Sequence, residues 1–338
     1  MSVGWRAARS TTGYFHSRVN RNFNNLWQPK ERLSIMDVSA RYIFSPRFSL
    51  EASLPIVFNQ WSQLFPILGS PLGRRANLNA NGLGDLSLYA NTWLLKRKQH
   101  PLHNFALGIG IKVPTGNWFT KDTYPNLQGT ISSNRTVFPP AIMPGDGGTG
   151  LLVGFNAYKI LAHPDRFRGT TFFADGLYLV NPRDTNGAPS VVALSQVPIP
   201  AQLQNRLVNS VPDTWTATVG VSMPLPNTIE NERLRGLRVN LTGRGEGISE
   251  HDLIGRSNGF RQPGYALAVG PGFSYAYKHS LWTVEVPIIF ARTIIPTPNL
   301  VPGLPTIVNG RPTANFSPTR NMGLVAPVAL LVRYTRTF

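Results

Sequence analysis

The carboxyl-terminal stretch Met322–Phe338, MGLVAPVALLVRYTRTF, decides the fold of this chain. Alternate side chains of a β-strand lie on opposite faces, so the stretch divides into two registers. One register is apolar apart from Arg336, and the other is small, mixed and then polar. The apolar register comprises Met322, Leu324, Ala326, Val328, Leu330, Val332, Tyr334 and Phe338. Since strands of soluble domains usually have about 5–6 residues, this length favours a strand that crosses a membrane.

The end of the stretch resembles the closing strand of bacterial outer-membrane β-barrels. In those proteins a terminal Phe, preceded by aromatic and apolar residues at alternate positions, is recognised by the insertion machinery. Phe338 and Tyr334 fit this pattern, whereas Arg336 departs from it. The resemblance implies that the outer-membrane insertion machinery is a partner of this chain. A long strand in a soluble β-protein is the alternative that this stretch alone leaves open.

The composition also favours a membrane barrel. Charged residues make up 14% of the 338 residues, against about 25% in an ordinary soluble domain. The 31 Gly and 29 Pro residues suit a chain with many turns. The mean hydropathy is -0.10, and the absence of any run of about 20 apolar residues excludes a helical membrane protein. Low charge without a hydropathy peak is typical of a transmembrane barrel, in which apolar and polar residues alternate.

The formal net charge of +17 is spread along the chain. Only short basic groups such as Arg74–Arg75 and Lys96–Lys98 stand out, so the sequence does not predict a nucleic-acid partner. On a barrel the cations suit anionic lipopolysaccharide beside the membrane lipid, or an anionic small-molecule solute. Cys is absent, so we expect neither a disulfide framework nor a Cys-based metal site.

The rest of the chain repeats the alternation and pairs into hairpins. In Phe105–Val113, for example, every second residue is apolar. We count twelve strands. The eleven connections between them alternate strictly between long and short, six being long and five short. The long ones are Ser10–Glu31, Gln60–Asn81, Pro114–Gly148, Asn181–Pro212, Gly243–Gln262 and Thr293–Arg320, and the short ones include Ser45–Arg47, Lys96–His100 and Asn227–Leu234.

This order of connections is typical of one class of protein. Bacterial outer-membrane barrels have an even strand number, short periplasmic turns and long external loops, and long structureless loops are unusual in compact soluble domains. The sequence therefore predicts an all-β fold: a single antiparallel up-and-down transmembrane β-barrel of about 12 strands. We expect the barrel to span residues 1–338 as one domain and to lie in the bacterial outer membrane.

The amino terminus lacks the features of a secretory signal. Met1–Arg6 has no basic n-region, apolar h-region or cleavage site. We expect either that this is the mature part of an exported chain or that its start codon lies downstream of the true one. A chain that never leaves the cytoplasm is the alternative.

Six short motifs, taken in order, resemble the bacterial outer-membrane barrel family named for the meta-pathway of phenol degradation. They are Ser2–Arg6, Gly82–Asp85 (GLGD), Gly108–Gly116 (GIGIKVPTG), Pro144–Gly148 (PGDGG), Val180–Gly187 (VNPRDTNG) and Gly259–Tyr265 (GFRQPGY). Members of that family are commonly labelled transporters. The resemblance covers most of the chain and implies a barrel linked to the uptake of hydrophobic or aromatic compounds. It supplies no functional residues to carry over.

The sequence predicts no catalytic residue, metal ligand or cofactor site. Gly255–Gly259 matches G-x-S-x-G around Ser257, but that motif needs a strand–turn–helix elbow, and here it follows His251 and Asp252 in a loop. The six His residues do not have metalloprotease spacing, and Gly243–Gly247 is not followed by the helix of a dinucleotide fingerprint. We therefore expect that the protein is not an enzyme. A lipid-modifying enzyme that uses Ser257 is the alternative from another functional class.

Nine charged residues fall in the polar registers, and we predict that they line the lumen or contact a substrate: Asp37, Arg41, Glu51, Asp85, Lys112, Asp175, Arg238, Glu285 and Arg333. Interior charges need partners, so one interpretation is a network of ion pairs that plugs the lumen. The other is a selectivity ring for anions. On the opposite faces, Leu88, Val286 and Val328 are expected to contact lipid.

The strand number limits the function. Eight-stranded barrels are filled by their own side chains and 16-stranded barrels hold open channels, so twelve strands leave room for a narrow passage or a ligand cavity. The sequence favours an outer-membrane channel or transporter for small compounds, hydrophobic or aromatic ones included. A lipid-modifying enzyme and a closed structural or adhesive barrel are the alternatives.

Overall fold

The fold was analysed in a computed structural model. It describes residues 1–338 except 68–69, 127, 138, 164–166, 194–200, 226–233, 296–297, 303–305, 309–310, 314–315 and 321–322. Most of the predicted turn Asn227–Leu234 and the predicted strand residue Met322 lie outside the described residues.

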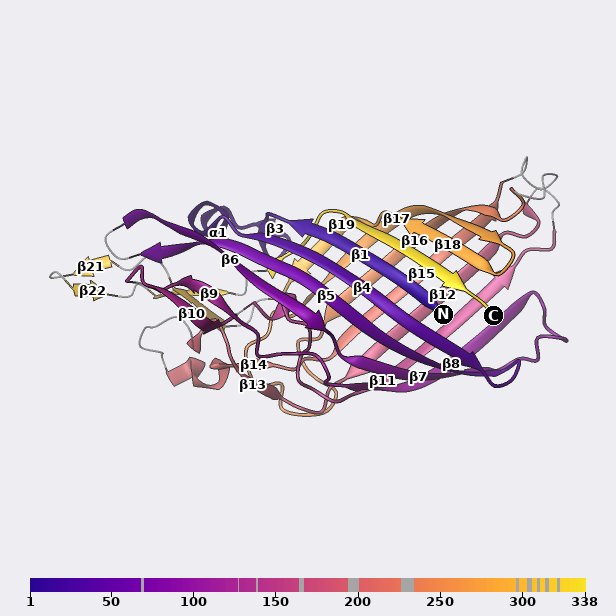
Figure 1. Cartoon of the computed structure of the whole chain (residues 1–338), viewed down its shortest axis with the longest axis horizontal. Helices are drawn as coiled ribbons and strands as arrows, with labels where there is room; N and C mark the ends of the chain where they lie inside the picture. The colour runs from indigo at the N-terminus through magenta and orange to yellow at the C-terminus, as the bar shows by residue number, and fades with distance from the viewer. Residues whose placement is uncertain are drawn as a thin grey trace.

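One antiparallel sheet of 14 strands forms the wall (Figure 1). Its strands are β1 (Ser2–Ser10), β4 (Lys30–Ile43), β5 (Phe48–Ile67), β6 (Ser70–Leu83), β7 (Leu86–Trp93), β8 (His103–Val113), β11 (Gly150–Ile160), β12 (Thr171–Val180), β15 (Thr214–Pro224), β16 (Leu237–Ile248), β17 (Gly264–Tyr277), β18 (Ser280–Glu285), β19 (Ile288–Ile294) and β25 (Ala329–Arg336). β6 and β7 are successive pieces along β5, as are β18 and β19 along β17, so the described sheet has twelve wall positions.

The wall closes on itself. β16 pairs with β17, and β1 pairs with β4 on one side and with β25 on the other, so the first and last strands of the chain are neighbours. Trp5, for example, lies opposite both Met36 and Val332. Both termini lie toward the end that carries the short turns (Figure 1), as expected for an even number of strands. The predicted transmembrane barrel of twelve strands is confirmed.

Alternation places apolar side chains on the outer face. Leu88, Val286 and Val328 are 37%, 37% and 43% exposed, as are many apolar side chains on neighbouring strands, such as Ile109 at 58%. So large an apolar surface is stable only against lipid. In the described part of the chain, no helix is long and apolar enough to cross a membrane.

The two faces of β7 allow a matched test. Leu88→Arg is expected to lower the free energy of unfolding by about 2–4 kcal/mol if the site lies near the bilayer midplane, because it places a charge in hydrocarbon. Ser87→Arg, one residue earlier and on the opposite face, should cost less. Refolding titrations in lipid vesicles measure both values, and equal costs would contradict the assignment of the faces.

Three sequence predictions about loops were wrong. Gln60–Asn81 is not a loop, because β5 and β6 continue as a paired hairpin through it. Likewise β16 continues to Ile248, because Thr242, Arg244 and Glu246 keep the alternation while glycines occupy the opposite face. The region Ser10–Glu31 contains a short helix, α1 (Arg21–Trp27), which begins where Asn20 Oδ1 accepts a hydrogen bond of 3.0 Å from Phe23 N.

The closing stretch is not one continuous strand. It divides into β24 (Gly323–Leu324) and β25, with Pro327 between them. Pro327 and Pro287 face each other across the last ladder bonds, where Ile289 N donates to Pro327 O at 2.9 Å and Ala329 N donates to Pro287 O at 3.0 Å. Beyond this point the chain leaves the wall, because proline offers no N–H to continue the ladder, and β24 pairs instead with β2 (Gly13–Phe15).

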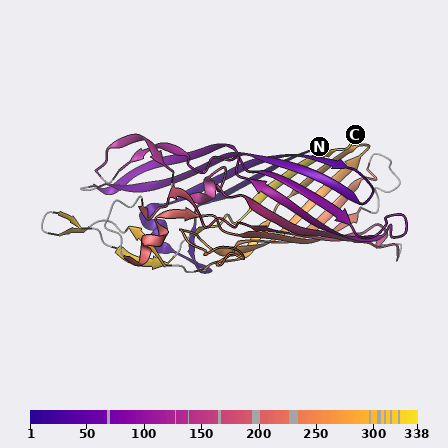
Figure 2. The ribbon, with the colours of Figure 1, turned by 90° about the horizontal axis from the view of Figure 1, so that it is seen from below.

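The long connections form a layer over one end of the barrel (Figure 2). The remaining elements of this layer are β3 (Arg18–Val19), β9 (Lys121–Pro125), β10 (Ile131–Thr136), the 3₁₀ helices Pro140–Ile142 and Ala201–Arg206, β13 (Thr185–Pro189), β14 (Val208–Ser210), β20 (Pro298–Pro302), β21 (Thr306–Val308), β22 (Arg311–Thr313) and β23 (Phe316–Arg320). A small core of Phe65, Leu78, Tyr124, Val137 and Ile142 holds β5 and β6 against β9 and β10. This part of the layer is therefore packed structure and not free loop.

Candidate functional site

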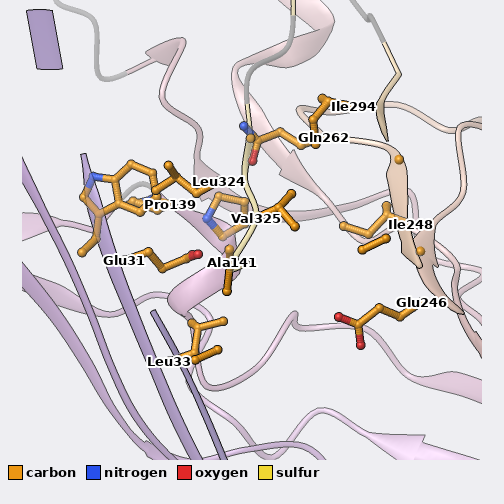
Figure 3. A pocket seen from close by; sticks show the side chains of 18 of the residues that line it. Glu31, Leu33, Pro139, Ala141, Glu246, Ile248, Gln262, Ile294, Leu324 and Val325 are labelled. Atoms are coloured by element: carbon orange, nitrogen blue, oxygen red, sulfur yellow. The ribbon is translucent and has the colours of Figure 1, made fainter. Parts of the chain in front are cut away.

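A cavity of about 530 Å³ lies inside the barrel at the end covered by this layer (Figure 3). Its walls are mainly apolar side chains from distant parts of the chain. Leu33, Trp61, Ile248, Ile294, Leu324 and Pro139 are among them. A cavity of this size with mostly apolar walls and few charged groups is typical of a site for a small hydrophobic ligand.

The interruption of the closing stretch supplies part of this lining. Val328 and Leu330 lie on the outer face, where they are 43% and 37% exposed. Leu324 and Ala326 belong to the same apolar register but line the cavity, because the chain turns inward at Pro327. The apolar register thus faces lipid after Pro327 in the sequence and lines the cavity before it.

An ion pair crosses the lumen within the cavity. Arg6 Nη2 on β1 donates to Glu246 Oε1 on β16 at 2.8 Å, and both residues line the cavity. The strands are not neighbours: β17, β18 and β25 separate them in the sheet. The pair therefore bridges non-adjacent strands, and the cavity extends past it to Arg244 and Ala268.

Further charged residues line the lumen between this pair and the short-turn end of the barrel. Asp37 and Arg333 lie on either side of Gly4, whose missing side chain leaves them facing each other. Arg41 Nε donates to Glu51 Oε2 at 2.7 Å across the β4–β5 hairpin. Arg41 and Glu51 thus form an ion pair of the kind that one interpretation of the lumen charges predicts, while Asp37 and Arg333 interact electrostatically without a bond.

The other lumen residues are likewise held by neighbours. Thr218 hydrogen-bonds Asp175, which also interacts electrostatically with Arg244 and Arg333. Thr242 Oγ1 donates to Glu285 Oε1 at 2.8 Å. At the short-turn end, Arg238 donates to Ser222 Oγ at 2.8 Å and to Gly169 O at 2.7 Å.

Lys112 sits in a buried cluster of charges at the edge of the barrel. Its ammonium group bonds both Asp146 and Asp85, the latter at 3.4 Å, and Lys112 is 6% exposed. Asp85 also accepts hydrogen bonds from Gly116 N at 2.9 Å and Asp146 N at 3.2 Å. The cluster fastens the junction between β6 and β7 to the long connection Pro114–Gly148.

The motifs behind the family resemblance meet around this cluster. Lys112, Asp85 and Asp146 come from three of them, and a fourth contributes Arg183, which donates to Gly147 O at 2.6 Å, and Asn186, which donates to Asp146 O at 2.9 Å. Their role in this structure is to hold the loops to the barrel rim.

The loop around Ser257 is held by a hydrogen bond and a buried ion pair. Its Oγ accepts a hydrogen bond of 2.8 Å from Asp252 N, and Asp252 is neutralised by Arg261 at 2.6 Å in a pair whose side chains are 3% and 1% exposed. Among the described residues, no hydrogen bond joins Ser257 to the exposed His251. No strand–turn–helix elbow surrounds the serine, as the motif would require.

The described residues contain no group of three or more His, Asp or Glu side chains that could hold a metal ion.

In the β9–β10 hairpin, burial raises the pKa of the Tyr124 hydroxyl, and the nearby Arg135 partly opposes this shift. The Arg135 guanidinium stacks 4.0 Å from the centre of the Tyr124 ring and donates to Pro125 O at 2.5 Å. Both residues border the cavity.

None of the nine predicted residues borders the cavity within the described structure; its charged lining comprises Arg6, Glu31, Arg135, Arg244 and Glu246. Sequence reasoning missed these five. For Arg244 and Glu246 a signal was present, since the alternation of β16 continues through its glycines. Glu31 and Arg135 lie in predicted loops, where no periodicity marked them.

Several solved structures resemble this chain, an outer membrane channel among them. The COG4313 outer membrane channel from Pseudomonas putida F1 matches with a TM-score of 0.53 at 12% identity, and the match covers 100% of this chain and 94% of that one. This chain is an outer-membrane β-barrel. A Pseudomonas aeruginosa FadL homologue matches at 8% identity with a TM-score of 0.42, covering 99% and 89% of the two chains. The Ralstonia pickettii toluene transporter TbuX matches at 10% identity with a TM-score of 0.40, covering 100% and 89%.

No protein-family model matches the sequence, and no curated protein resembles it.

Proposed function

We propose that the protein is an outer-membrane transporter for small hydrophobic compounds, aromatic ones included. The observation that carries this proposal is the apolar cavity of about 530 Å³ inside the barrel, which the Arg6–Glu246 pair crosses. A channel for hydrophilic solutes needs a wet, polar path, whereas this cavity offers mainly hydrocarbon and aromatic contacts.

The sequence motifs support the same assignment, since the family that they resemble is linked to the uptake of hydrophobic and aromatic compounds. The likeness to an outer-membrane channel supports the barrel and leaves the substrate to the chemistry of the cavity. We also propose that the protein is not an enzyme, because Ser257 is bound to the Asp252 backbone and has no His partner among the described residues.

Uptake by intact cells tests the proposal. Cells that carry the protein in their outer membrane should accumulate naphthalene faster than cells without it, since the sugar-rich outer leaflet impedes hydrophobic solutes. A small sugar of similar mass should enter both cells at the same rate. Equal naphthalene rates, or a faster entry of the sugar, would contradict the proposal.

A further inference from the structure

Glu31 is a buried carboxylate inside an otherwise apolar part of the cavity. It lies near the start of β4, beside Ser10 of β1 and Trp61 of β5, and is 5% exposed. Figure 3 shows its carboxylate directed toward the middle of the cavity, with Leu33, Pro139 and Leu324 around it. Within the described part of the chain, neither a hydrogen bond nor an ion pair satisfies its oxygens.

A carboxylate in this position is unfavourable unless something else satisfies it. A buried charge without a partner costs several kcal/mol at least, and folded proteins rarely keep one outside a functional site. Glu31 is therefore a candidate for binding a group that the protein itself does not provide.

The cations of the cavity are engaged elsewhere. Arg6 interacts with Glu31 electrostatically but forms no hydrogen bond with it, because the Arg6 guanidinium group bonds Glu246 at 2.8 Å. Arg135 is held by Pro125 O and the face of the Tyr124 ring. Arg244 lies one inward position below Glu246 and interacts electrostatically with Asp175, while its Nε has no hydrogen-bond partner among the described residues. The described lining contains two carboxylates, and Glu246 is bonded to Arg6, so Glu31 is the one without a bonded cation.

We infer that the cavity binds amphiphiles with a cationic end, and that Glu31 pairs with their ammonium group. This inference rests on the proposed function and specifies the substrate class of the same cavity. The ammonium supplies hydrogen-bond donors and charge to Glu31, while the hydrocarbon part contacts Leu33, Trp61 and Leu324. A charge-assisted hydrogen bond in an apolar surrounding is stronger than one in water, so Glu31 selects amines over neutral analogues.

Three probes of equal chain length test this inference: octylamine, octanol and octanoate. Their binding to the full-length protein in nanodiscs of zwitterionic lipid is followed by tryptophan fluorescence, since Trp27, Trp61 and Trp215 line the cavity. Octylamine should bind at least about tenfold more tightly than octanol, and octanoate should bind more weakly than both. The variant Glu31→Gln should abolish the preference for the amine and leave octanol binding nearly unchanged.

Glu51→Gln is the matched control, because Glu51 is a lumen carboxylate bound to Arg41 and outside the cavity. It should leave all three affinities as they are. Equal binding of octylamine and octanol by the wild type would overturn the role of Glu31 while the apolar cavity stands. So would an amine preference that survives in Glu31→Gln. Failure of all three probes to bind would overturn the proposed function as well.

Discussion

Lys112→Met is expected to lower the free energy of unfolding by about 3–5 kcal/mol. The substitution keeps most of the side-chain length and removes the charge that Asp85 and Asp146 share. Lys112 is 6% exposed, so water cannot replace its ammonium group without opening the cluster. The two carboxylates then repel each other at the point where the β6–β7 junction is fastened to the long connection Pro114–Gly148.

Urea titration of the protein refolded in lipid measures this loss. Lys98→Met is the control, because Lys98 lies exposed in a short turn and should tolerate the change. Adding Asp85→Asn to Lys112→Met should recover part of the loss, since it removes one of the two unpaired charges. A Lys112→Met protein as stable as the wild type would show that the cluster is not a structural fastening.

Ala8→Trp is expected to reduce naphthalene uptake at least about tenfold. Ala8 lines the cavity from β1, two residues beyond Arg6 on the same face. An indole at this position would occupy space that the solute needs, next to the Arg6–Glu246 pair. The cavity is about 530 Å³, so one large side chain removes a substantial part of it.

The adjacent Ala7→Trp places the same indole on the opposite face of β1, toward lipid. Its uptake rate should equal that of the wild type at equal amounts of protein in the outer membrane, which immunoblotting of membrane fractions measures. If Ala7→Trp and Ala8→Trp slow uptake equally, solute does not pass through the cavity.

The barrel could be predicted because its signals are local and repeated. Alternation such as Phe105–Val113 reports which side chains meet lipid, and Pro/Asn-rich stretches report where strands end. The same reasoning failed where a strand extends beyond the membrane and carries polar or small residues there. β6 and the last part of β16 are such segments: β6 alternates asparagines with small residues around Leu78, and the last part of β16 alternates glycines with Thr242, Arg244 and Glu246.

The cavity could not be predicted, because it depends on long-range arrangement. Arg6 and Glu246 are 240 residues apart and meet only when the barrel closes. Pro327 was visible in the sequence, yet its effect depends on Pro287 lying opposite it in the neighbouring strand. The nine charged residues were selected from local registers. In the described structure they interact with neighbours in the lumen or at the barrel rim, and none of them lines the cavity.

We expect a hydrophobic solute to occupy the space between β4, β5 and β16 beside the Arg6–Glu246 pair. A crystal structure of the protein with 1-bromonaphthalene tests it most directly, since anomalous scattering locates the bromine without reference to the fitted ligand. We expect a bromine peak in van der Waals contact with Leu33, Trp61 or Leu324, and no such peak in Ala8→Trp. Bromine found only on the lipid-facing surface, with the cavity of the wild type unoccupied, would contradict the account.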